Sequence, residues 1–254
     1  MDSSRVVWLY RFVLAGFVVL LVLPLLTRGI GDWEAVYLAA GKNLRSWADL
    51  LEGGTSYVYP PFGALVAVPF TYLPRGAGLA AWALVNVIAV AVMLACAWRL
   101  TGGRGLPGEP GTGRVDHAAF WLGGLCAIGF FLDAAANWQT DLVIGALLMG
   151  GGMLLVKGRG LAAGATFGIA AAFKCTPLLF APYLLWKRQF LGAAALVVVA
   201  VGLNFLPDLF YPPADGKPRV LVWKDRFLTP MADRTRDPGV WASAVEYNHS
   251  LAGV

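Results

Sequence analysis

The chain has 254 residues, of which 58% are hydrophobic and only 14% are charged. Apolar blocks about as long as a bilayer is thick recur along it, which indicates a polytopic membrane protein. The net charge of +5 could point to nucleic acid, but the basic residues form short clusters between apolar blocks, as loop charges that orient membrane spans do. We therefore expect an all-α, polytopic transmembrane protein that contacts membrane lipids and binds no nucleic acid.

The apolar runs predict membrane crossings in chain order at 8–27, 79–98, 117–136, 141–156 and 190–210. The first run has a basic flank and no convincing small-residue cleavage site, so we expect an uncleaved span. The stretch 62–73 is too short to span easily and predicts a re-entrant or interfacial helix. The stretch 161–186 is interrupted at 174–177 by a lysine and a proline, which predicts two short helices meeting at an internal break.

Basic clusters between these runs predict the orientation, because Lys and Arg accumulate in cytoplasmic loops. One arrangement, with a cytoplasmic N-terminus, puts all the clusters on the cytoplasmic side. The segment 28–61, the turn 137–140 and the segment 212–254 then face the extracytoplasmic side, and the Gly- and Pro-rich loop 99–116 is a cytoplasmic connector. We expect a transmembrane module over 1–211 followed by an extracytoplasmic loop. The clusters are Arg5 with Arg11, Arg99 with Arg104 and Arg114, Lys157 with Arg159, and Lys187 with Arg188.

The cysteines and the acidic residues show no pattern of metal ligands. Cys96, Cys126 and Cys175 all lie inside apolar stretches, which is typical of small buried side chains. No His, Asp or Glu cluster has ligand spacing, and no Gly-rich loop that could cradle a nucleotide is present. We therefore expect no metal and no cofactor.

An ordered set of motifs resembles glycosyltransferase family 87, over about 31–254. The resemblance implies a GT-C-like fold and a polyprenol-phosphate-mannose-dependent mannosyltransferase. At position 141 an Asp stands where the family usually has Asn. Family members have more spans than this chain, which therefore looks like an N-terminal portion whose end at Val254 is a truncation. The motifs are Gly31-Asp32-Trp33-Glu34, Tyr57-Val58-Tyr59-Pro60-Pro61, Pro69 with Leu73-Pro74, Asn137-Trp138-Gln139-Thr140-Asp141, Ala163-Gly164, Ala170-Ala171-Ala172-Phe173-Lys174 with Pro177, and Tyr247-Asn248-His249-Ser250-Leu251-Ala252-Gly253.

Sugar transfer from a lipid phosphate needs a base for the acceptor hydroxyl, a cation or donor set for the departing phosphate, and an aromatic surface for the sugar. The resemblance implies that Asp32 is the base, with Glu34 as the reserve acid. The alternative is structural, with Asp32 as the N-cap of the following helix and Glu34 as a solvated acid in its first turn.

Lys174 is the candidate for the donor phosphate, because an ammonium in an apolar stretch is costly unless it meets an anion or lines a wet cavity. The alternatives are snorkelling and a structural pair with a carboxylate such as Asp133 or Asp141. Asn248 and His249 are further candidates for the phosphate or sugar, against an ordinary polar loop.

Amide and aromatic side chains complete the predicted site. Gln139 and Asn137 either hydrogen-bond a sugar hydroxyl or cap the helix that starts at 141. Tyr57 and Tyr59 either stack on a sugar or lie in the aromatic belt at the membrane interface.

Residues and resemblance together predict an inverting mannosyltransferase of the cytoplasmic membrane, with its active site on the extracytoplasmic face. It would use a polyprenyl-phosphate sugar donor and a glycolipid or glycan acceptor. One alternative is a transporter or flippase, in which Lys174 and the broken helix form a substrate site. Another is an inactive fragment of a transferase.

Overall fold

The computed structural model describes residues 31–50, 52–54, 57–104 and 117–229, together with residues 8, 12, 15, 16 and 19. These residues form helices, turns and loops without any β-strand, which confirms the all-α prediction for the described part of the chain. Most of the predicted first span at 8–27 and the whole motif 247–253 lie outside the described residues.

Three helices of the described part are long and apolar enough to cross a membrane, as expected at 79–98, 117–136 and 190–210. The helix expected at 141–156 also forms, but its 16 residues reach only about 24 Å, less than the roughly 30 Å hydrocarbon core. By length it is therefore a shorter apolar helix rather than a clear crossing. These helices are α4 (Arg75–Leu100), α5 (His117–Ala136), α9 (Phe190–Phe210) and the shorter α6 (Asp141–Val156).

The apolar stretch 161–186 is broken where its lysine and proline predicted a break. Helix α7 (Gly160–Phe173) ends because Lys174 is extended, with φ −140° and ψ 136°. A short 3₁₀ turn over Thr176–Leu179 follows, with Pro177 in its first turn, and it leads into α8 (Phe180–Trp186). The chain thus turns back near Lys174, and α7 and α8 are both too short to span.

Close packing of α7 on α9 relies on glycine. A Cβ at Gly164 would lie 1.9 Å from the carbonyl oxygen of Gly192, and one at Gly168 would lie 2.6 Å from that of Leu196. Small residues let the two backbones approach in this way, as is common between membrane helices. Helix α6 packs on the other side of α7, where a Cβ at Gly151 would overlap the Phe167 ring.

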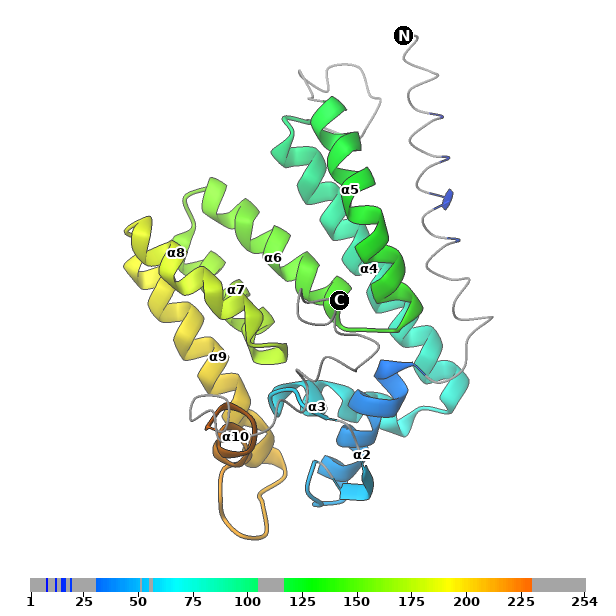
Figure 1. Cartoon of the computed structure of the whole chain (residues 1–254), viewed down its shortest axis with the longest axis vertical. Coiled ribbons are helices and arrows are strands. Elements are labelled where there is room, and N and C mark those ends of the chain that lie inside the picture. Colours follow the sequence, from blue (N-terminus) through cyan, green and yellow to red (C-terminus); the bar gives the residue numbers. More distant parts are fainter. Residues whose placement is uncertain are drawn as a thin grey trace, which may run out of the picture.

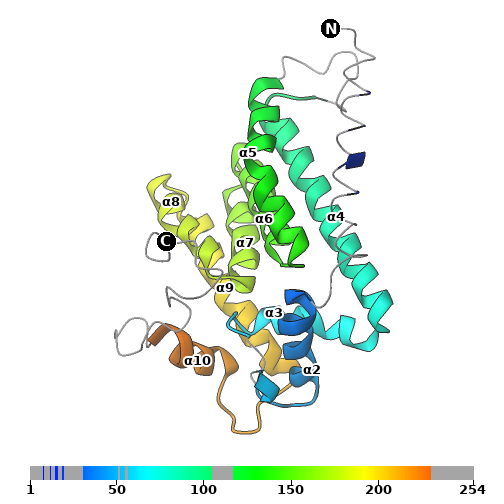
Figure 2. The ribbon, with the colours of Figure 1, turned by 45° about the vertical axis from the view of Figure 1, so that its right-hand side comes forward.

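The loops that carry basic residues gather toward one end of the bundle, and the short helices α2, α3 and α10 gather toward the other (Figures 1 and 2). The turns at 101–104, 157–159 and 187–189 lie toward the upper end in Figure 1, as the charge-based orientation requires. The assignment of that end to the cytoplasm stays a prediction. The lower end holds α2 (Ala39–Arg45), α3 (Phe62–Ala67) with the 3₁₀ turn Val68–Tyr72, and α10 (Arg219–Trp223).

Aromatic stacking fixes the segment after Gly31 against the long helices. The π-helical turn η1 (Trp33–Leu38) buries Trp33 completely. The Trp33 ring stacks in parallel on Trp82 of α4, with centroids 3.6 Å apart, and meets Phe70 edge-on at 5.1 Å. Burial of two indoles supplies several kcal/mol by area, so this contact is a main anchor of η1.

Candidate active site

The position of Asp32 is set by backbone contacts with the turn that precedes α6. The Asp32 backbone N–H donates to the carbonyl oxygen of Asn137 at 3.0 Å. A Cβ on the neighbouring Gly31 would come within 2.9 Å of three atoms of the Trp138 side chain, so only glycine allows this approach. Two segments more than a hundred residues apart in sequence are thus held together directly beside the carboxylate.

The Asp32 side chain is bound by Gln139 rather than by its own helix. Gln139 Nε2 donates to Asp32 Oδ2 at 3.1 Å, and the Asp32 side chain makes no capping hydrogen bond. Within the described residues, Asp32 Oδ1 has no hydrogen-bond partner. Asp32 thus occupies the N-cap position of the following helix, but the capping hydrogen bond of the structural alternative is absent. The alternative in which Gln139 or Asn137 caps α6 is not found either, since the residue before α6 is Thr140 and it makes no side-chain cap.

Glu34 forms an ion pair and is not the solvated acid expected for a first turn. Arg75 donates from Nε to Glu34 Oε1 at 2.6 Å and from Nη2 to Oε2 at 2.8 Å, while the Glu34 side chain is only 16% exposed. The hydrogen bond from Arg75 lowers the pKa of Glu34. Because both carboxylate oxygens are occupied, Glu34 ties η1 to the start of α4 and is poorly suited to be a base.

Lys174 forms an ion pair with Asp141, one of the two carboxylates suggested as its structural partner from the sequence. Its Nζ donates to both carboxylate oxygens of Asp141, at 2.8 and 2.7 Å, and lies 5.2 Å from the centre of the Tyr59 ring. The other suggested partner, Asp133, instead accepts from Asn137 Nδ2 at 2.9 Å. The break after α7 lets the lysine reach the first residue of α6, so an unpaired cation in an apolar stretch is avoided.

Three tyrosines form a compact cluster beside this pair. Tyr37 and Tyr59 stack with centroids 5.0 Å apart, and Tyr57 meets both rings edge-on at 5.8 and 5.9 Å. Burial raises the pKa of each hydroxyl, so all three stay neutral and keep their protons. Tyr57 is buried and its hydroxyl donates to the Pro60 carbonyl at 2.6 Å, so Tyr57 does not lie in an interfacial belt.

Thr140 is a member of the site that the sequence did not single out. It is fully buried, and its Oγ1 is 3.0 Å from the hydroxyl of Tyr37. No spacing rule predicts this contact, because it joins residues on separate elements. Its only signal was its place between Gln139 and Asp141.

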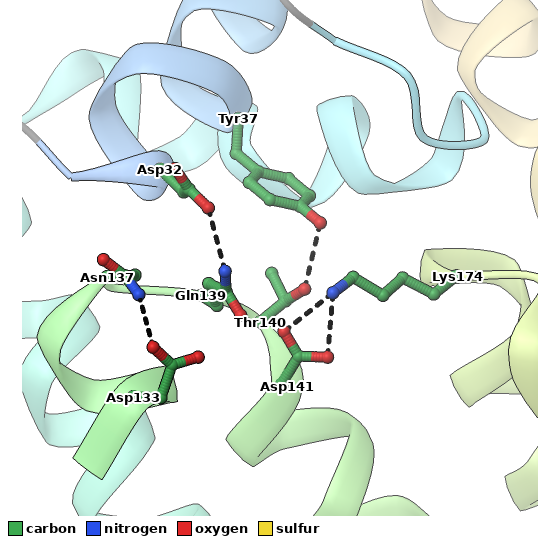
Figure 3. Close-up of polar contacts among 8 residues, drawn as sticks. All are labelled: Asp32, Tyr37, Asp133, Asn137, Gln139, Thr140, Asp141 and Lys174. Carbon is green, nitrogen blue, oxygen red and sulfur yellow. Dashed lines mark hydrogen bonds and ion pairs between the residues drawn. The ribbon is translucent and has the colours of Figure 1, made fainter. Parts of the chain in front are cut away.

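Residues from three separate elements therefore meet at one place (Figure 3). Asp32 and Tyr37 come from η1 and the residue before it, Gln139, Thr140 and Asp141 from the start of α6, and Lys174 from the break after α7. Asn137 is in the same turn, but its amide is bound to Asp133, while Asn248 and His249 lie outside the described residues. Across the described part of the chain, no group of three His, Cys, Asp or Glu side chains could hold a metal ion.

The fold and the site together define a helical membrane protein with a carboxylate, an amide and a lysine gathered at the end of its long helices. The chain belongs to glycosyltransferase family 87, whose family model matches residues 57–236, more than half of its length. The family expected from the motifs is thus confirmed. The matched range contains Gln139, Asp141 and Lys174, whereas Asp32 precedes it.

One curated relative is a polyprenol-phosphate-mannose-dependent alpha-(1-2)-phosphatidylinositol pentamannoside mannosyltransferase of Mycobacterium tuberculosis (strain CDC 1551 / Oshkosh). It is 30% identical over 154 residues, which are 59% of this chain and 33% of the relative. The chain thus spans about a third of the length of the curated relative that it matches. No solved structure matches the chain.

Proposed function

We propose that this chain forms part of a membrane glycosyltransferase that moves a mannosyl residue from a polyprenyl phosphate to a glycolipid or glycan acceptor. Family membership supports the class of reaction, and the name of the curated relative supports the lipid-linked mannose donor. The observation that carries the proposal is the Asp32 carboxylate, which is held by a neutral amide, does not cap its helix, and lies in the same cluster as Lys174.

Asp32 is the general base in this proposal. Its carboxylate takes the proton of an acceptor hydroxyl, whose oxygen attacks the anomeric carbon of the donor sugar. The new bond between that oxygen and the anomeric carbon forms as the bond between the anomeric carbon and the phosphate oxygen breaks. The leaving polyprenyl phosphate keeps the electron pair, and a single displacement of this kind inverts the configuration. Gln139 positions the base through its hydrogen bond to Oδ2.

Lys174 stabilises the negative charge that builds on the leaving phosphate. An ammonium has three N–H donors, and Asp141 accepts from Lys174 at two oxygens, which leaves donor capacity for a phosphate oxygen. A fixed cation beside developing charge is worth more in a site that excludes water than at an exposed surface. Tyr59, stacked on Tyr37 and 5.2 Å from the ammonium, provides an aromatic face next to this position.

The active site is proposed to face the extracytoplasmic side of the cytoplasmic membrane. The basic turns lie toward the opposite end of the bundle from η1 and the start of α6, and loops rich in Lys and Arg stay in the cytoplasm.

A transporter is the second candidate because the break at Lys174 resembles the discontinuous helices of transporters. A transferase converts the donor into a new glycoside, whereas a transporter moves its substrate unchanged, so one assay separates the two functions. Transfer of label from the donor to an acceptor defines the transferase, whereas label that crosses a vesicle membrane unchanged defines the transporter.

The test is mannosyl transfer from a radiolabelled polyprenyl-phosphate mannose donor in membranes that contain the full protein. Asp32→Asn keeps the shape of the side chain and removes the base, so we expect the rate to fall by about 10² to 10⁴-fold, with little change in the donor KM. Asp225→Asn is the matched control, since Asp225 is an exposed acid paired with the neighbouring Lys224. Unchanged turnover in Asp32→Asn would exclude Asp32 as the base.

A further inference from the structure

A second site lies next to the tyrosine cluster, in a cavity of about 260 Å³. It forms between the loop after α2, at 46–50, and the segment 213–227 that contains α10. Asp32, Gln139 and Lys174 do not line it. Tyr57 connects the two places, because its ring borders the cavity and also lies edge-on to Tyr37 and Tyr59.

Aromatic side chains provide two walls of the cavity. Trp223 is fixed, since its Nε1 donates to the Val58 carbonyl at 3.0 Å. Trp47 is 54% exposed although it borders the cavity, and its backbone has φ 63°, a left-handed conformation that large side chains rarely adopt. An exposed indole held at the edge of a cavity offers a flat apolar face to a ligand.

The charged side chains of the lining have both signs. Asp49 and Asp215 supply carboxylate acceptors, and Lys217, Arg219 and Arg226 supply cationic donors. Arg219 already donates from Nη1 to Asp208 Oδ1 at 2.8 Å. A phosphate would meet the carboxylates as like charges. Sugar hydroxyls both donate and accept hydrogen bonds, so a neutral sugar can use acids and bases in one pocket. Mixed polar groups between aromatic walls therefore fit a carbohydrate better than an anion.

We propose that this cavity binds one hexose unit of the glycan acceptor, with the Trp47 ring against the sugar face. The volume is below the roughly 300 to 1,000 Å³ of typical drug-sized pockets, which suits a single sugar ring. The assignment rests on the proposed transferase function. It places an acceptor subsite beside Tyr57, whose ring contacts Tyr59, and the Tyr59 ring lies 5.2 Å from the Lys174 ammonium proposed to bind the donor phosphate.

The test compares Trp47→Ala with Trp186→Ala, an exposed tryptophan that does not line the cavity and is 75% exposed. In the transfer assay, we expect Trp47→Ala to raise the acceptor KM at least tenfold and to leave the donor KM unchanged. Trp186→Ala should leave both constants unchanged. Trp47→Phe keeps an aromatic face and should restore part of the acceptor affinity, which separates a lost contact from a misfolded protein.

Direct binding of α-linked mannobiose to the detergent-solubilised protein, measured by saturation-transfer NMR, tests the cavity without any turnover. The signal should be lost in Trp47→Ala and kept in Trp186→Ala. An unchanged signal in Trp47→Ala would overturn the assignment, and so would displacement of mannobiose by inorganic phosphate at equal concentration. Loss of mannobiose binding in Trp47→Ala without any transfer by the wild-type protein would keep the cavity and reject the transferase. Transfer by the wild-type protein, with mannobiose binding and the acceptor KM unchanged in Trp47→Ala, would keep the transferase and reject the cavity.

Discussion

The ion pair between Lys174 and Asp141 predicts that one substitution should improve donor binding. If Lys174 binds the donor phosphate, it must share its charge with Asp141, which already accepts at 2.8 and 2.7 Å. Asp141→Asn removes the competing charge while it keeps the size of the side chain and one acceptor oxygen. The resemblance implies an Asn at this position, so we expect the substitution to be compatible with the fold.

The magnitude follows from the exposure of the pair. The side chains are 20% exposed for Lys174 and 37% for Asp141, so the pair is neither fully exposed nor buried. Exposed pairs are worth about 0.2 to 1 kcal/mol and removal of one buried partner costs about 3 to 5 kcal/mol, so we take about 1 to 2 kcal/mol here. At about 1.4 kcal/mol per tenfold, the donor KM should fall by about 5- to 30-fold. Thermal stability should fall as well, because Lys174 loses its counter-ion.

The assay is the initial rate of mannosyl transfer at varied donor concentration, in membranes with matched protein content. Lys174→Met removes the cation and keeps the length of the side chain, so we expect it to raise the donor KM. The double variant Asp141→Asn with Lys174→Met closes a mutant cycle. In that background, Asp141→Asn should have almost no effect on the donor KM. The reasoning is refuted if Asp141→Asn raises the donor KM, or lowers it equally with and without Lys174.

Two further predictions concern contacts that hold the site together. Thr140→Val removes the 3.0 Å hydrogen bond between Thr140 and the buried Tyr37 hydroxyl and should cost about 1 to 3 kcal/mol. Tyr37→Phe with Thr140→Val should cost clearly less than the two single changes added together. Denaturant unfolding measures both, and additivity would show that this contact contributes nothing. Glu34→Gln should slightly lower the midpoint of thermal unfolding at pH 7. Because the hydrogen bond from Arg75 lowers the pKa of Glu34 below its ordinary 4.5, the stabilisation is present above that pH and is lost as the pH falls through the lowered value. The wild-type and Glu34→Gln midpoints should therefore converge in acid, and a gap that is equal at pH 3 and pH 7 would contradict the role of charge.

Local chemistry explains which parts of the fold could be predicted. Length and apolarity predicted the long helices, and the proline at 177 with the cation at 174 predicted the break after α7. These features depend on neighbours in sequence. The charge pattern also placed the segment with Asp32 and the turn with Gln139 on the same side of the membrane, which is a necessary condition for their hydrogen bond.

Contacts between distant segments could not be predicted in the same way. The ion pair between Arg75 and Glu34 and the hydrogen bond between Tyr37 and Thr140 depend on how η1 packs against the ends of the long helices. That packing is fixed by the stack of Trp33 on Trp82. Charge suggested Asp133 or Asp141 as the partner of Lys174, and the second is found, but charge and hydropathy do not predict which aromatic and neutral polar side chains meet.

The two carboxylates on either side of Gln139 have different partners, and this difference separates their roles. Asp141 has both oxygens bound to the Lys174 ammonium, so a proton taken from an acceptor would have to displace a cation. Asp32 accepts from the neutral amide of Gln139 at one oxygen, and such a donor does not compete for the charge of the carboxylate. The partners therefore favour Asp32 as the base and Asp141 as the acceptor that holds the Lys174 ammonium in position until a phosphate arrives. For this reason neutralising the two acids should have opposite consequences, a loss of turnover at position 32 and tighter donor binding at position 141.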